Sequence, residues 1–152
     1  MKTIISPEQP DTPDAVMLIE ELEEHLAPFY PETSRHGYSV EKLIKQGVAF
    51  FVTRRNNIPA GCGGVQFYGR EYGELKRMFV RPQFRGLGLA KLMLAHLEAH
   101  ALEHDIPLLR LETGIFQKDA IGLYERMGYR ACPPFGEYTN DPLSVFFEKK
   151  IA

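Results

Sequence analysis

Apolar positions at the start of the chain repeat with a helical period. Four of them are spaced for one helix face within a glutamate-rich stretch: Val16, Ile19, Leu22 and Leu26. Thr12-Pro13-Asp14 supplies an N-cap, a proline at the first helical position and an early acid, so this amphipathic helix starts at residue 13 and stops near Pro28. We expect a short strand before it, at 3–6, and a short helix after it, at 40–46.

From residue 48 onward the period changes to that of strands. Apolar or alternating runs of strand length occupy six segments: 48–53, 60–68, 74–81, 107–113, 129–132 and 143–149. Asn56-Asn57 between the first two runs favours a hairpin turn. Glycines in the run at 60–68 weaken that strand and indicate a bulge. The nearly continuous apolar run at 107–113 is typical of a strand covered on both faces.

Two further helices separate these strands. The segment 89–104 is the strongest helix of the chain, and 119–127 is a second one, ended by Gly128 as a left-handed C-cap. The order is therefore one strand, two helices, three strands, a helix, a strand, a helix and two strands. This order predicts a single α/β domain over residues 1–152, with a mixed sheet and helices on both of its faces.

Composition narrows the function classes. The formal net charge is -2, and 25% of residues are charged, which argues against a general nucleic-acid or membrane-surface binder. We find no apolar run near the ~20 residues of a spanning helix and no secretory h-region, and we expect a cytoplasmic protein. Cys62 and Cys132 form no Cys-x-x-Cys pair and the five histidines show no ligand spacing, so we expect buried thiols, solvent-facing histidines and no metal.

A basic loop rich in glycine joins the fourth strand to the strongest helix. A helix N-terminus presents about four unpaired N–H groups and roughly half a positive charge. Gly86 and Gly88 let a ligand approach the main chain, while Arg81, Arg85 and Lys91 add side-chain charge. These features predict a pyrophosphate-binding loop.

Two common phosphate-binding motifs do not match this loop. A dinucleotide-binding fingerprint needs its first glycine directly after the strand, but residues 81–85 intervene here and Lys91 replaces the third glycine. A Walker-type loop is excluded because the chain has no Gly-Lys-Ser or Gly-Lys-Thr. A merely tight connection between strand and helix does not account for two arginines beside two glycines.

Three motifs in order carry a family resemblance. They are Leu75 to Pro82, then Arg85-x-x-Gly88-x-Ala90, then Ala120 to Tyr129. On these motifs, and over nearly its whole length, the chain resembles the Gcn5-related N-acetyltransferase (GNAT) superfamily. The resemblance implies a mixed, mostly antiparallel sheet of about seven strands with about four helices, and a V-shaped split between strands 4 and 5 that takes acetyl-CoA.

The resemblance also implies roles for particular residues. Main-chain groups at the split and in the loop would hold acetyl-CoA: Met78, Phe79, Val80, Arg85, Gly86, Leu87, Gly88, Leu89 and Ala90. The Val80 amide would polarise the thioester carbonyl, and Tyr124 would protonate the departing thiolate. Glu112-Thr113-Gly114 replaces an asparagine found in some relatives, which leaves the contacts on that side of the cofactor open.

Acetyl transfer to an amine requires a group that removes a proton. An alkyl ammonium has a pKa of about 10.4, so a base or a water chain to an acid is needed. Glu74, at the start of the fourth strand, and Glu112, at the end of the fifth, are the candidates. Tyr30, Arg35 and Phe135 are candidate acceptor-binding residues in the variable loops, and a carboxylate on Arg35 would favour amino-acid-like acceptors.

The sequence thus predicts an N-acetyltransferase that moves the acetyl group of acetyl-CoA directly to a primary amine of a small-molecule or amino-acid-like acceptor, through a ternary complex. Neither cysteine has a plausible histidine base for a covalent intermediate. Two alternatives stay open: acetylation of a protein N-terminus or lysine, and a non-catalytic acyl-CoA sensor. Because relatives often dimerise, a homodimer also stays open.

Overall fold

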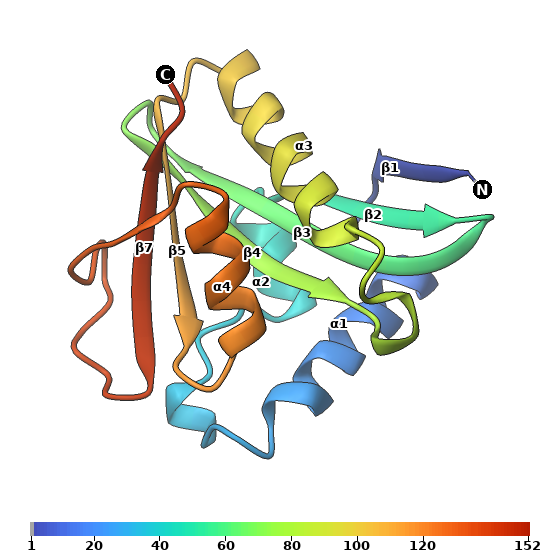
Figure 1. The fold of residues 1–152 in the computed structure, drawn as a ribbon, viewed down its shortest axis with the longest axis horizontal. Coiled ribbons are helices and arrows are strands. Elements are labelled where there is room, and N and C mark those ends of the chain that lie inside the picture. The colour runs from blue at the N-terminus through green and yellow to red at the C-terminus, as the bar shows by residue number, and fades with distance from the viewer. Residues whose placement is uncertain (1) are drawn as a thin grey trace.

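Seven strands form one mixed sheet in the computed structural model, which describes residues 2–152 (Figure 1). The strands are β1 (Thr3–Pro7), β2 (Ala49–Arg55), β3 (Ile58–Tyr68), β4 (Tyr72–Val80), β5 (Leu108–Gly114), β6 (Arg130–Ala131) and β7 (Ser144–Lys150). The α-helices are α1 (Pro13–Leu26), α2 (Val40–Lys45), α3 (Leu89–Glu103) and α4 (Lys118–Arg126). None of these helices is both long and apolar enough to cross a membrane.

The strands follow the order β1-β2-β3-β4-β5-β7-β6, and β4 and β5 run parallel while the five remaining neighbour pairs of these strands run antiparallel. This arrangement confirms the predicted mixed, mostly antiparallel sheet and the predicted order of elements. Thr12 caps α1 as expected, since its hydroxyl accepts from the Ala15 N–H at 3.2 Å. Asn56 and Asn57 both have positive φ, at 51° and 67°, as a two-residue hairpin turn requires.

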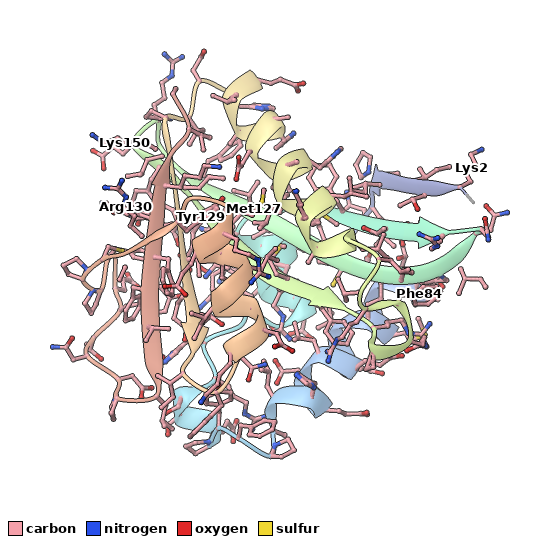
Figure 2. All side chains as sticks on the ribbon, viewed as in Figure 1. Lys2, Phe84, Met127, Tyr129, Arg130 and Lys150 are labelled. Carbon is pink, nitrogen blue, oxygen red and sulfur yellow. The ribbon has the colours of Figure 1, made fainter. Side chains whose placement is uncertain are left out.

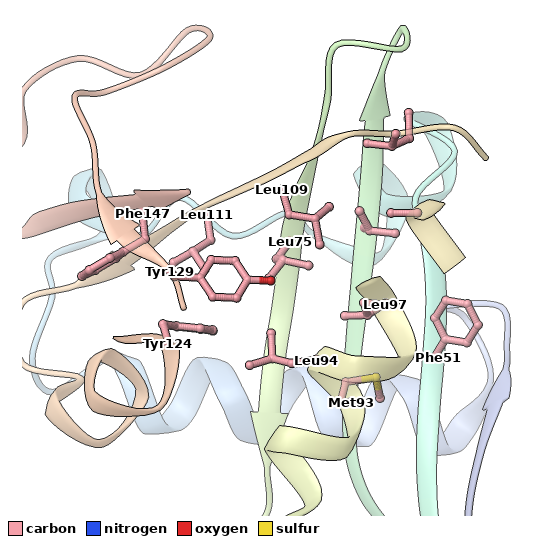
Figure 3. Packing of buried hydrophobic residues seen from close by; sticks show 13 residues of the cluster. Phe51, Leu75, Met93, Leu94, Leu97, Leu109, Leu111, Tyr124, Tyr129 and Phe147 are labelled. Atoms are coloured by element: carbon pink, nitrogen blue, oxygen red, sulfur yellow. The ribbon is translucent and has the colours of Figure 1, made fainter. Parts of the chain in front are cut away.

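Helices cover both faces of the sheet, and alternate residues of each strand supply the two cores. Phe51 packs with α3 and α4, whereas its neighbours Phe50 and Val52 pack with α1 and α2. Side chains fill the space between the sheet and these helices (Figure 2). The core on the α3 and α4 face includes Tyr124 and Tyr129, whose rings lie next to each other (Figure 3).

Two minor predictions were wrong in part. Cys62 is buried, but Cys132 is only half-buried because it lies in the loop after β6. The histidines of α3 do not all face solvent: the His96 ring lies edge-on to Phe51 at 4.6 Å, and His100 stacks on Phe67 at 5.7 Å. Burial, then the neighbouring His104, lowers the pKa of His100.

The sheet contains two bulges. The bulge predicted in β3 is present opposite β2, where Thr53 pairs with Gly61 and Arg54 pairs with Pro59, so one residue is inserted. The second bulge inserts its extra residue in β4, because Cys62 and Gly64 of β3 pair with Phe79 and Lys76. Arg77 of this bulge has a φ of +54°.

The strands β4 and β5 separate soon after they meet. They pair only at Gly73 with Leu109 and at Glu74 with Arg110, although β4 continues to Val80 and β5 to Gly114. The bulge in β4 follows Lys76, in the part of β4 that no longer pairs with β5. The separation of the strands is the split that the resemblance implied, and it positions the site described next.

Candidate active site

The loop between β4 and α3 presents an open main chain. Gly86 and Gly88 have φ values of +80° and +76°, and a Cβ added at either would meet no atom within 4 Å. Gly88 is the N-cap of α3 and brings no side-chain cap. The first helical hydrogen bond runs from Leu92 N–H to the Gly88 carbonyl at 3.1 Å, which leaves the amides of residues 89–91 without a helical partner. Such a surface fits a phosphate group.

The basic side chains of this loop have different partners. Arg81 is not free to bind a ligand in the way the sequence predicted, because its Nε donates to Glu21 at 3.0 Å and its Nη1 donates to the Pro59 carbonyl at 3.1 Å. It therefore fastens α1 to the loop. Arg85 is exposed and donates from Nε to the Val80 carbonyl at 3.2 Å, while Lys91 is exposed at the first turn of α3.

A groove of about 680 Å³ runs from this loop into the split. All of the predicted cofactor-binding residues line it except Leu87, whose side chain is 46% exposed. The Arg81 N–H donates to the Ala60 carbonyl of β3 at 2.8 Å. Successive amides of a strand point to opposite sides, so the Val80 N–H points away from β3 and into the split. The groove also includes residues that sequence reasoning missed, among them His25, Phe29 and Phe116.

A second cavity, of about 140 Å³, lies beside the groove and is bounded by β4, β5, α1 and the loops after α1 and β6. Its polar lining residues include Arg35, His36, Glu74, Lys76, Arg77, Glu112 and Tyr138. The two cavities share five lining residues: Leu22, Met78, Gln117, Ala120 and Tyr124. The groove and the second cavity therefore meet at the split.

Tyr124 stands at this junction on the last turn of α4. Its side chain is 6% exposed, and within residues 2–152 its hydroxyl has no hydrogen-bond partner. Burial raises the pKa of Tyr124 far above its usual value, and the charge of Glu112 adds to the effect. The hydroxyl thus keeps its proton at any ordinary pH and is free to donate it.

Glu112 lies in the wall of the second cavity, where the Ser144 hydroxyl donates to its Oε2 at 2.8 Å. Burial raises the pKa of Glu112, and this effect outweighs the opposing hydrogen bond from Ser144 and the opposing charge of His36. A half-buried carboxyl of raised pKa in a cavity wall is suited to exchange a proton with a ligand.

Glu74, in contrast, is fully occupied. Lys76 forms an ion pair with its Oε2 at 2.8 Å, and the Tyr138 hydroxyl donates to the same oxygen at 2.6 Å. The Tyr68 hydroxyl donates to Oε1 at 3.4 Å. Lys76 also lies 3.9 Å from the centre of the Tyr38 ring, so the pair is enclosed by aromatic side chains. Glu74 therefore holds the cavity wall together.

The three predicted acceptor-binding residues have different positions. Tyr30 lines the second cavity, but its hydroxyl accepts from the Phe116 N–H at 2.9 Å and donates to Gln117 at 3.0 Å, which ties the loop after α1 to the loop before α4. Arg35 lines the same cavity. Phe135 contributes to neither cavity wall; it packs edge-on against Phe146 at 5.7 Å, and Tyr138 of the same loop takes the wall position.

The chain is similar in sequence to known acetyltransferases. The chain is 39% identical over 148 residues to an IAA acetyltransferase of Azospirillum brasilense, covering 97% of each protein. It is 34% identical over 123 residues to the uncharacterized N-acetyltransferase YsnE of Bacillus subtilis, covering 80% of this chain and 82% of that protein.

Solved structures share the fold. A crystal structure from Klebsiella pneumoniae, provisionally named an acyl-CoA N-acyltransferase, has a TM-score of 0.85 at 34% identity and covers 99% of this chain and 98% of its own. The PaiA N-acetyltransferase of Thermoplasma acidophilum, solved in complex with coenzyme A, has a TM-score of 0.78 at 19% identity and covers 99% of both chains. The model of the acetyltransferase (GNAT) family matches residues 19–129, and the chain belongs to this family.

Proposed function

We propose that this protein transfers the acetyl group of acetyl-CoA to the primary amine of a small molecule, directly and within a ternary complex. One observation carries the proposal: the groove that suits the cofactor and the second cavity lie side by side and share Tyr124 as a lining residue. A donor and an acceptor bound in these two spaces would meet at the split, which is what direct transfer requires.

Several features support acetyl-CoA as the donor. The free amides at the start of α3 and the positive φ values of Gly86 and Gly88 provide a cradle for a pyrophosphate. The Val80 N–H, which points into the split, would donate to the thioester carbonyl and stabilise negative charge that develops there. Acetyl-CoA would supply the activated acetyl group.

The two catalytic roles follow from the surroundings of each side chain. Glu112 would take a proton from the acceptor ammonium, because its raised pKa brings it closer to that of an amine than an ordinary carboxyl. The neutral amine then forms the C–N bond as the C–S bond breaks, and Tyr124 would give its proton to the departing thiolate. The proton that the new amide nitrogen loses would return to the Tyr124 oxygen, and Glu112 would release its proton to solvent. Glu74 would act by positioning Lys76 and Tyr138, since its oxygens are already occupied.

The size of the second cavity favours a small acceptor. Its volume of about 140 Å³ is close to that of the ~150 Å³ engineered cavities that hold one benzene molecule. A relative of this chain is named for the small molecule IAA. A protein N-terminus or lysine is the second acceptor class, and the experiment described next distinguishes it from a small amine.

The test is release of free thiol from acetyl-CoA with amino acids, polyamines, aminoglycosides and short peptides, with Tyr124→Phe as the control variant. We expect turnover on one class of small amine and a strong loss in the control. Turnover on peptides alone would move the acceptor to proteins. Tight acetyl-CoA binding without turnover on any amine or peptide would contradict the catalytic proposal and favour a sensor.

A further inference from the structure

Two arginines in the wall of the second cavity share one glutamate, Glu23 of α1, and form a cluster with it. Arg77 donates from Nη2 to Glu23 Oε1 at 2.6 Å, and Arg35 donates from Nη1 to Glu23 Oε2 at 3.3 Å. One carboxylate is thus shared by two guanidinium groups. Because arginine stays charged at any ordinary pH, the cluster carries one positive charge that no carboxylate within it balances.

Each arginine of this cluster also has an unused donor. The Nε atoms of Arg35 and Arg77 are buried and, within residues 2–152, have no hydrogen-bond partner. The Arg77 side chain is 3% exposed, so bulk water does not take that role. Buried N–H groups without partners are rare in native proteins, so each of these two atoms lacks an acceptor that the described residues do not supply.

The fold holds Arg77 in this position. Its φ of +54° belongs to the bulge in β4, and its guanidinium packs so closely on Gly37 that a Cβ there would collide with Nη1. The bulge puts Arg77 on the same side of the sheet as Lys76, toward α1. A planar guanidinium fixed in this way is suited to bind a planar carboxylate.

The position of the cluster sets the direction of the ligand. Arg35 and Arg77 line the second cavity but not the cofactor groove, whereas Tyr124 lines both. A ligand with its anionic end on the arginines would extend from there toward the junction. Glu112, in the same cavity, would then face the end that reacts.

We propose that the acceptor carries a carboxylate besides its amine, and that the guanidinium groups of Arg35 and Arg77 bind this carboxylate in the second cavity. The acceptor class is therefore amino acids and similar aminocarboxylates. This inference rests on the proposed function, and it names the substrate of the same site.

The test compares each amino acid that is turned over with its carboxamide and its decarboxylated amine, in wild type, Arg35→Gln and Arg70→Gln. Arg70 is the matched control, since it lies exposed in the turn between β3 and β4. We expect Arg35→Gln to raise the KM for the amino acid about 10- to 100-fold, with little change for the decarboxylated amine and for acetyl-CoA. Arg70→Gln should behave as wild type.

Turnover confined to amines without a carboxylate, or equal losses on all three compounds in Arg35→Gln, would overturn the inference. If no compound is turned over, the proposed function fails, and calorimetry on the coenzyme A complex still measures binding of the same amino acids. Binding that is lost in Arg35→Gln would then support the carboxylate site, and absence of binding to wild type would refute it. Circular dichroism of Arg35→Gln excludes unfolding as the cause.

Discussion

Tyr124→Phe separates the chemical role of the hydroxyl from its role in packing. The substitution removes one oxygen and keeps the ring, which packs at 5.8 Å from the Tyr129 ring. The hydroxyl makes no hydrogen bond within the described part of the chain, so none is lost. We therefore expect the free energy of unfolding to change by no more than about 1 kcal/mol.

The expected loss of turnover is larger. General acids contribute about 10²- to 10⁴-fold to enzymatic rates. A thiol with a pKa of about 8.5 leaves fairly well without a proton, which favours the lower end of this range. We expect kcat to fall about 100-fold, equivalent to about 2.7 kcal/mol of barrier height, with the Kd for acetyl-CoA nearly unchanged. Steady-state thiol release and calorimetric titration measure the two quantities.

Tyr129→Phe is the matched control, because it removes a hydroxyl that is bonded and outside both cavities. Tyr129 donates to Glu98 at 2.9 Å. Since Lys149 remains as a partner of Glu98, we expect a cost of about 1–2 kcal/mol, or a Tm lowered by about 3–6 °C, with kcat unchanged. If Tyr124→Phe retains full kcat, or if both variants lose activity alike, the assignment of Tyr124 as the proton donor is refuted.

Three further substitutions test other parts of the site. Gly88→Asp should weaken acetyl-CoA binding at least 100-fold, because it places charge and bulk in the pyrophosphate cradle. Gly47→Asp is its control: Gly47 has a similar φ of +65° and open space around it, so the backbone strain should be similar and acetyl-CoA binding unchanged. Calorimetric Kd values for acetyl-CoA decide between the two outcomes. Glu112→Gln should lower kcat about 10²- to 10⁴-fold. It should also remove the rise of kcat/KM with pH that comes from Glu112, because only the ionised carboxyl accepts a proton. A rise of kcat/KM with pH that is the same in the variant would contradict the role of Glu112 as the base. Lys76→Met leaves the Glu74 carboxylate buried without its cation, so the free energy of unfolding measured in urea should fall by about 3–5 kcal/mol. The double variant with Glu74→Gln should recover part of this loss. If the losses of the two single variants simply add in the double variant, the ion pair is refuted.

Ionisation of Glu112 lowers the stability of the folded protein, whereas ionisation of a salt-bridged acid raises it. The pKa of Glu112 is raised in the folded state, so the folded protein binds the proton more tightly than the unfolded chain. Ionisation of Glu112 therefore opposes folding above the folded-state pKa, and this penalty disappears as the pH falls below the unfolded-state value of about 4.3. Urea unfolding of Glu112→Gln over this range should lack this contribution.

Most of the fold was predictable because it depends on local signals. These signals act over a few residues: the period of apolar positions, the cap at Thr12, the Asn56-Asn57 turn and the left-handed glycines. The predicted bounds of the helices and strands lie within about two residues of those in the structure. The cofactor loop was predictable for the same reason, since its chemistry lies in one continuous segment.

The second cavity was harder to predict because its wall combines distant segments. Lys76 and Tyr138 lie 62 residues apart in the sequence yet contact the same carboxylate, that of Glu74. The local sequence around either residue does not predict this contact. Arg81 shows the opposite error, because a loop arginine beside a predicted phosphate site pairs instead with Glu21 of α1. In both cases the role of a charged or polar side chain depends on its tertiary contacts, which the local sequence does not show.

The bulge in β4 explains how two cations of one strand come to lie in the wall of the second cavity. Along a regular strand alternate side chains face opposite sides, so Arg77 would lie on the side opposite Lys76, against α3. The inserted residue breaks this alternation: Leu75 and Met78 pack with the α3 core, while Lys76 contacts Tyr38 and Arg77 contacts Glu23 on the other face. Gly63 of β3 makes room for the insertion, because a Cβ there would lie 2.7 Å from the Met78 sulfur. The glycines that weaken β3 as a strand thus permit the irregularity in its neighbour. That irregularity lies in the part of β4 that does not pair with β5, and it turns a second cation toward the cavity in which the acceptor would bind.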